Sequence, residues 1–303
     1  MRLATAGLAV LLAAGKLRAA ETYLTPSIEA QAGFEQNRWT ESGSGQGSAF
    51  WLAAPGVEWL RFGQKTEAAL GAEYRVTSYF EEGFEYREEP SGYGRWRYFD
   101  GPYEAGLTAG GGQYRDRALP DDDCAYWYAR PYASRTLARR PAEWTLGGTI
   151  RQTFYDTSVY TSATDRTDLQ LEVRPGLRWH FSTRLTLWAE GYAEWNTSDA
   201  PEAEYSGFGA AAGGQYQASA RWTLGAWAET GTRVYDVEVD GTEWRDTPLR
   251  AGVWTTCRLR PWLELLAAVD GESFSSTLDG NDYSWWRAAA GIRLVFEHVM
   301  GAR

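Results

Sequence analysis

The sequence predicts an all-β protein: a transmembrane up-and-down antiparallel β-barrel of about 14 strands. Aromatic residues make up 15% of the 303 residues, including 16 Trp and 18 Tyr, yet the mean hydropathy is only −0.48. Long segments alternate apolar and polar residues with a period of two, which is typical of strands with one apolar and one wet face. Short links alternate with longer polar links, as expected of the two ends of such a barrel.

The alternation is clearest over residues 167–181, where Leu, Val, Trp and Phe alternate with polar and charged residues. A period of two over this length indicates a strand, and it exceeds the ~5–6 residues of an ordinary globular strand. The other strands expected in this half are 185–195, 205–219, 222–235, 249–260, 263–273 and 283–296, with 236–246 as a polar loop.

The first half follows the same rhythm less regularly. Its expected strands are 27–35, 49–62, 65–80, 103–114, 126–135 and 144–155, with a weak strand over 95–99. Counting the weak strand gives about 14 strands, and omitting it with a partner gives 12; either even number places both termini at one end. Pro55, Pro131 and Pro175 interrupt descending strands, and we expect β-bulges there because proline lacks the ladder donor.

The N-terminus predicts export. Arg2 precedes an apolar run over residues 3–14, and small residues near Ala20 offer a cleavage point, so residues 1–20 read as a signal peptide. A buried N-terminal helix is the alternative. Residues 21–303 then form a single barrel domain, because no linker or shift in composition divides them.

Charge and cysteine content narrow the function further. Three of the 30 basic residues fall in the signal peptide, leaving 27 basic against 40 acidic residues, a formal charge of −13. This balance argues against a nucleic-acid partner. Cys124 is expected at a loop mouth and Cys257 on an outer face, which favours free thiols, with a disulfide as the alternative. With only two histidines, no metal site or other cofactor is expected.

The end of the chain carries a family resemblance. The segment Gly-Ile-Arg-Leu-Val-Phe over residues 291–296 resembles the final strand of bacterial outer-membrane β-barrels, most closely the β-barrel porins. The resemblance implies that Gly291, Leu294 and Phe296 form a signal for the barrel assembly machinery. It also implies an outer-membrane location, in contact with lipid and lipopolysaccharide. The sequence departs from the family pattern in having Leu294 where an aromatic residue is usual, and in the seven residues that follow Phe296.

The face opposite the apolar one is strongly charged. Ascending strands carry mainly acids and descending strands mainly arginines, with Glu58, Arg151 and Arg233 as exceptions. Neighbouring strands of the barrel therefore place opposite charges side by side, which is favourable across a ladder. The residues predicted to line a pore are Glu29, Glu35, Glu172, Arg174, Arg178, Glu190, Glu194, Glu229, Arg250, Arg258, Glu264, Asp270, Glu272, Arg287 and Arg293.

These features predict a porin-like channel for passive diffusion of small polar solutes or ions. The small inner residues Gly207, Gly209, Ala211 and Gly213 are expected to leave space in the lumen, and the excess of acids predicts a mild cation preference.

Two alternatives stay open. In the first, the charges only make a polar lumen tolerable, and the barrel is a non-conducting scaffold or binding protein that acts through its extracellular loops. In the second, less favoured, His180 and a nearby serine form an outer-membrane lipase. No enzymatic activity is expected, and the oligomeric state is left undetermined.

Overall fold

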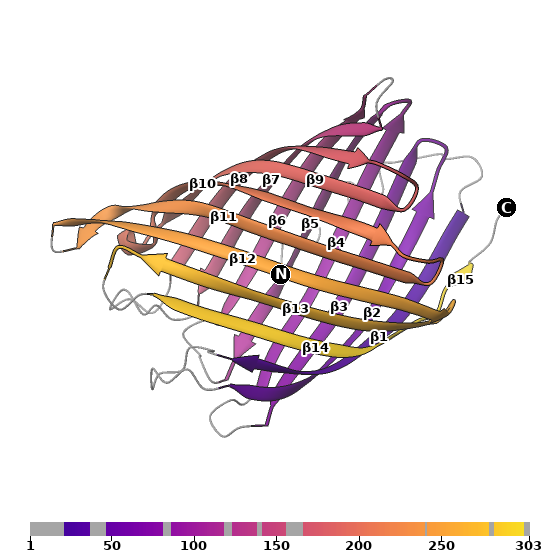
Figure 1. The fold of residues 1–303 in the computed structure, drawn as a ribbon, viewed down its shortest axis with the longest axis horizontal. Coiled ribbons are helices and arrows are strands. Elements are labelled where there is room, and N and C mark those ends of the chain that lie inside the picture. Colours follow the sequence, from indigo (N-terminus) through magenta and orange to yellow (C-terminus); the bar gives the residue numbers. More distant parts are fainter. Residues whose placement is uncertain are drawn as a thin grey trace.

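The computed structural model describes residues 21–36, 47–80, 86–117, 123–137, 141–155, 166–239, 241–278 and 282–299. The predicted signal peptide lies outside the described residues. Each long strand pairs with its neighbours in sequence, and β14 pairs with β1, which closes the sheet into a barrel (Figure 1). The predicted antiparallel barrel is confirmed, with 14 long strands rather than 12.

The long strands run from one end of the barrel to the other, and a two-residue strand, β15, extends the edge of β1 near its start. Their bounds are β1 Glu21–Gln36, β2 Ser48–Phe62, β3 Thr66–Tyr79, β4 Tyr86–Asp100, β5 Tyr103–Asp116, β6 Cys124–Thr136, β7 Ala142–Tyr155, β8 Arg166–His180, β9 Leu185–Ser198, β10 Tyr205–Gln217, β11 Trp222–Val239, β12 Thr242–Arg260, β13 Leu263–Ser276, β14 Tyr283–Val295 and β15 His298–Val299.

Two segments are more regular than the sequence suggested. The segment 95–99, expected to be a weak strand, belongs to the 15-residue strand β4. The alternation is not visible in the first half of β4 because Pro90, Gly92 and Gly94 occupy outward positions. The segment 236–246, expected to be a loop, belongs to the β11–β12 hairpin, which projects beyond its neighbours at the left of Figure 1. Its strands read as polar because the outward positions of 236–246 lack the apolar side chains that mark the rest of these strands.

The prediction of bulges at Pro55, Pro131 and Pro175 is wrong. Each proline is paired in register with the preceding strand. In the ladder with the following strand, the proline and the residue before it are unpaired, but the register is the same before and after this gap, so no residue is inserted. In an antiparallel pair, the N–H and C=O of one residue point to the same neighbour, so a proline disturbs only one ladder. The register shifts instead within the β11–β12 hairpin, between Val234 and Glu238, and between Arg258 and Arg260.

Inward and outward positions follow the predicted alternation. Leu171 and Leu224 are 41% and 44% exposed on the outside of the barrel. Glu172 and Glu229, on the same two strands, point inward, where they form ion pairs. Closing the sheet removes its free edges, and an apolar outer surface on a closed barrel is suited to a bilayer.

The two cysteines lie on different strands and on opposite faces. Cys257 is a buried free thiol on the outer face, paired in register with Trp222 and Leu265. Cys124 is buried at the start of β6, next to the link that follows β5, as predicted.

In the described part of the chain, no helix is long and apolar enough to cross a membrane.

Candidate functional site

The candidate site is the inner surface of the barrel wall. The register of the ladders places every residue predicted to line a pore on this surface: Glu29, Glu35, Glu172, Arg174, Arg178, Glu190, Glu194, Glu229, Arg250, Arg258, Glu264, Asp270, Glu272, Arg287 and Arg293. Most of these residues are engaged with one another, and the pattern of their ion pairs divides the wall into distinct regions.

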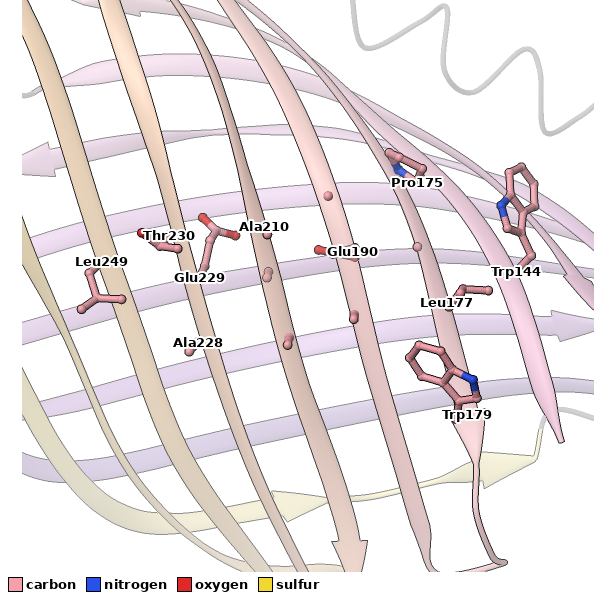
Figure 2. Close-up of a pocket in the computed structure, with 15 residues that line it drawn as sticks. Trp144, Pro175, Leu177, Trp179, Glu190, Ala210, Ala228, Glu229, Thr230 and Leu249 are labelled. Atoms are coloured by element: carbon pink, nitrogen blue, oxygen red, sulfur yellow. The ribbon is translucent and has the colours of Figure 1, made fainter.

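The densest region surrounds Arg174 on β8. Its guanidinium lies 2.9 Å from Glu172 Oε1, 2.8 Å from Glu190 Oε1 and 2.9 Å from Glu229 Oε2, so three carboxylates share one cation. Glu190 and Glu229 flank β10, where Figure 2 shows them on either side of Ala210. We call these four charged residues the Arg174 cluster.

The Arg174 cluster depends on a small residue in β10. Ala211 faces inward and is paired in register with both Glu190 and Glu229, so its short side chain lets the Arg174 guanidinium reach from β8 to β11. The planar guanidinium, with five donors, can bind several carboxylates at once, which a lysine ammonium does less well. Each carboxylate of this half-buried cluster therefore contacts the Arg174 guanidinium, although the four residues together carry a formal charge of −2.

The expectation that the small inner residues of β10 leave open space is wrong at Gly209 and Gly213. Aromatic rings of the neighbouring strand β9 lie over these two glycines. A Cβ atom at Gly213 would lie 2.5 Å from Trp188 Cζ2, and one at Gly209 would lie 2.5 Å from Tyr192 Cζ. The glycines therefore let large rings lie flat against the wall.

Where β1 meets β14, one predicted pair forms and one does not. Arg293 Nε donates to Glu29 Oε2 at 2.8 Å, and Arg293 also lies 3.7 Å from Glu264. Arg287 is opposite Glu35 and Asp270 in register, but its guanidinium lies over the Phe50 ring, at 4.4 Å. Glu35 instead accepts a hydrogen bond from Tyr79.

The remaining predicted residues form pairs that the sequence only partly indicated. Arg250 binds Glu272 at 2.9 Å, and Arg258 binds Glu264 at 3.1 Å. Further pairs involve residues outside the predicted set: Glu194 with Arg233 at 2.8 Å, and Arg178 with Glu143 at 3.4 Å.

A second network in the first half of the chain was not predicted as a site. Arg97 on β4 binds Glu104 at 2.6 Å and Glu67 at 3.2 Å, and Arg97 also donates to Tyr132 Oη. Arg95 joins the same network through Glu67 at 3.1 Å. Alternating acids and arginines on β3, β4 and β5 were visible in the sequence, but the weak prediction for β4 hid their alignment.

Arg130 on β6 and Arg151 on β7 differ from all of these. Both point inward, and neither forms an ion pair with a described residue. The Arg130 guanidinium lies 4.6 Å from the Tyr128 ring centroid, and that of Arg151 lies 4.5 Å from the Tyr126 centroid. The two tyrosines were not predicted from the sequence; glycines opposite them on β5 were the available signal.

The two residues of the alternative lipase have other partners. His180 Nδ1 lies 3.2 Å from Thr186 Oγ1. Ser182 Oγ accepts from the backbone N–H groups of Arg184 and Leu185 in the turn. The hydroxyl of Ser182 thus stabilises the turn after β8.

The predicted assembly residues lie where the barrel closes. Gly291 faces inward, and a Cβ atom there would clash with the Ala30 carbonyl oxygen of β1. Leu294 pairs with Ile28 on the outer face, and the Phe296 N–H donates to the Pro26 carbonyl oxygen at 2.9 Å, one residue beyond the end of β14. Recognition of these residues by an assembly machinery stays a prediction.

The outer face of β9–β11 is hollowed rather than flat. Small side chains on β9, β10 and β11 form the floor of a groove of 640 Å³. Trp144, Leu177 and Trp179 border it on one side and Leu249 on the other, as Figure 2 shows. The same three strands therefore carry small residues on the outside and, in β10, on the inside as well.

No protein-family model and no curated protein matches the sequence. Solved structures match in fold. OmpT of Vibrio cholerae is 9% identical, with 93% of this chain and 99% of that chain covered and a TM-score of 0.50. A TodX monoaromatic hydrocarbon channel mutant is 9% identical, with 94% and 91% covered and a TM-score of 0.50. An anion-selective porin from Comamonas acidovorans is 10% identical, with 91% and 100% covered and a TM-score of 0.49.

At these identities the similarity concerns the fold alone. A closed antiparallel barrel of 14 long strands, apolar outside and charged inside, is the architecture of proteins of the bacterial outer membrane. The chain therefore has the fold of the outer-membrane β-barrels.

Proposed function

We propose that the barrel is an outer-membrane channel for passive diffusion of small polar solutes or ions. The observation that carries the proposal is the exposure of charged side chains that point inward. Glu73 and Arg75, midway along β3, are 43% and 40% exposed although they face the inside of a closed barrel. This exposure supports a space inside the barrel that solvent can enter.

A polar, charged lumen supports ion passage because wall charges replace part of the hydration of an ion. The ion pairs of the Arg174 cluster keep this wall polar without filling the interior with apolar side chains. No catalytic step is assigned to the barrel.

The test is the conductance of the refolded protein in a planar bilayer. Gly147 faces inward, and a Cβ atom added there would have no neighbour closer than 3.9 Å, so Gly147→Trp should lower the single-channel conductance by narrowing the lumen. Val173→Trp is the matched control, because Val173 is 45% exposed on the outer face and its variant should conduct normally. A folded barrel that does not conduct would overturn the proposal and favour a scaffold or binding protein.

A further inference from the structure

We propose that Arg130 and Arg151 form an oxyanion site in the lumen wall, which makes the channel prefer small carboxylate- or phosphate-bearing anions over cations. The inference rests on the proposed channel function and names its solute class. It starts from the pairing of the inward arginines. Within the described residues, all of them form an ion pair with a carboxylate except Arg130, Arg151, Arg287 and Arg260, the last residue of β12.

Arg287 is distinguished from Arg130 and Arg151 by its neighbours. It lies opposite Asp270 and Glu35 in register, so carboxylates flank it on both sides. Arg130 is opposite Thr108, and Arg151 is opposite Tyr128 and Gln170. No carboxylate is directly opposite either of these two arginines in the described ladders.

The carboxylates one step further away are already engaged. Asp168 and Glu172 are the inward residues on either side of Gln170 on β8. Both are therefore diagonal to Arg151. Arg166 binds Asp168 at 2.6 Å, and Arg174 binds Glu172 at 2.9 Å. These two acids therefore compensate other cations, and the charge of Arg151 is left without a dedicated partner.

The two arginines are also neighbours of each other. Tyr128 is opposite Arg151, and Arg130 is two residues further along the same face of β6, so the arginines occupy diagonal positions of one ladder. Diagonal residues of an antiparallel pair are about 7–8 Å apart, and like charges at close range are unfavourable. A bound anion between them would convert this repulsion into attraction.

The tyrosines hold both arginines in place. The rings of Tyr126 and Tyr128 are stacked, with centroids 6.4 Å apart, and each lies beneath one guanidinium. A cation–π contact positions a guanidinium without neutralising its charge, in contrast to a carboxylate. The N–H groups at the edge of the guanidinium then remain suited to a forked oxyanion.

The space over these rings is accessible from the lumen. Arg130 is exposed although it points into the barrel. The tyrosine rings lie flat because Gly110 and Gly112 are beneath them: a Cβ atom at either position would lie within 2.9 Å of a tyrosine hydroxyl. An anion passing through the lumen can therefore reach Arg130 directly.

The pairing of the charges matters more than their number. Acids outnumber arginines along the chain, which predicted a mild cation preference. Most of the inward acids are bound to an arginine, as in the Arg174 cluster, whereas Arg130 and Arg151 are bound to no described carboxylate. Glu89 on β4 also faces inward, but it forms no ion pair with either of these arginines. We therefore expect a solute near β6 and β7 to meet two guanidinium groups that no described carboxylate binds.

The experiment measures reversal potentials in a KCl gradient across a planar bilayer containing the full-length refolded barrel. We expect the wild-type channel to prefer chloride. The Arg130→Gln/Arg151→Gln double variant should lower the chloride-to-potassium permeability ratio by about fivefold, the factor that one unit charge a few ångströms away exerts in water. Arg135→Gln is the matched control: Arg135 lies on the outside of the same strand, 5.2 Å above the Tyr103 ring, and its loss should leave the ratio unchanged.

A second measurement tests whether oxyanions bind at Arg130 and Arg151, independently of ion selectivity. Calorimetric titration of the solubilised barrel with sodium phosphate, and separately with sodium acetate, should show saturable binding that the double Gln variant loses and Arg135→Gln retains. The Arg130→Lys/Arg151→Lys variant keeps the charges but not the forks, so it should retain anion preference and lose oxyanion affinity.

The outcomes separate the two proposals. A conducting wild-type channel that prefers potassium, or a ratio unchanged by the double Gln variant, overturns the oxyanion site while the channel stands. A non-conducting barrel that still binds phosphate through these arginines overturns the channel and keeps the site. Absence of both phosphate and acetate binding overturns the site in either case.

Discussion

Arg174 and Arg130 face the same lumen from strands two apart, but their surroundings are opposite. Arg174 is half-buried among three carboxylates from β8, β9 and β11. Arg130 is exposed over a tyrosine ring, with Thr108 opposite it in register. Arg174 joins three carboxylates into one polar cluster, whereas Arg130 presents a charge that no described carboxylate binds.

The comparison indicates that the role of an arginine in the barrel wall depends on the groups that contact it. A half-buried guanidinium that joins several carboxylates stabilises the wall, and removing it leaves repelling acids. An arginine held by an aromatic ring contributes little to stability and can act on a solute. Four substitutions test this distinction, ordered from the largest expected effect on stability to the smallest.

Removing the shared cation should have the largest effect. Arg174→Met leaves Glu172, Glu190 and Glu229 facing one another, and because breaking a buried pair costs about 3–5 kcal/mol, this half-buried site should lose roughly 2–4 kcal/mol of unfolding free energy. Urea titration of the barrel refolded in lipid vesicles, followed by tryptophan fluorescence, measures it. If Arg130→Met lowered the unfolding free energy by as much as Arg174→Met, the distinction between the two arginines would be wrong.

A methyl group beneath the tyrosines should come next. Gly110→Ala places a Cβ atom 2.5 Å from the Gly92 carbonyl oxygen and 2.8 Å from Tyr128 Oη, so we expect a cost of about 1–3 kcal/mol from overpacking. The same urea titration applies. Gly147→Ala is the control, since its nearest neighbours are 3.9 Å away; equal losses in both variants would show that the ring is not wedged against the wall.

Removing one of three carboxylates should matter less. Glu229→Gln weakens the contact with Arg174 at 2.9 Å, but the guanidinium keeps Glu172 and Glu190, so we expect a loss of about 1–2 kcal/mol. A double-mutant cycle with Arg174→Met should give a combined loss below the sum of the single losses. Strict additivity would mean that the four residues do not act as one cluster.

The smallest effect is expected at Arg151. Arg151→Gln removes a charge that has no described carboxylate partner and relieves repulsion with Arg130, so the unfolding free energy should stay within about 0.5 kcal/mol of wild type. The urea midpoint and slope are the measurement. A loss above about 1 kcal/mol would show that Arg151 is a structural residue of the wall.

The sequence predicted strands well wherever the period of two was unbroken. The strand β8 was predicted to within one residue at each end, because Leu, Val and Trp mark most outward positions. Strand β4 was predicted too short, since glycine and proline occupy outward positions where no apolar signal then appears. Closure of β14 on β1 was predicted correctly from the order of the strands.

The site was harder to predict than the fold. Alternation alone identified which charges point inward, but ion pairing depends on the size of the residues between them. Arg174 reaches Glu229, three strands away, across the small side chain of Ala211. The proximity of Arg130 and Arg151 follows from the register of β6 and β7, which a single sequence does not determine.

The closing ladder between β1 and β14 has a consequence for the order of folding. Every other pair of long strands is adjacent in the chain, but Arg293 binds Glu29 across 264 residues. The entropy of closing such a long loop must be overcome before its contacts form, and non-local pairing of this kind slows folding. Until β14 arrives, the growing sheet has two edges whose backbone groups are unsatisfied in lipid. The pairing of β14 with β1 is therefore the step that satisfies both edges of the sheet and makes the barrel stable in the bilayer.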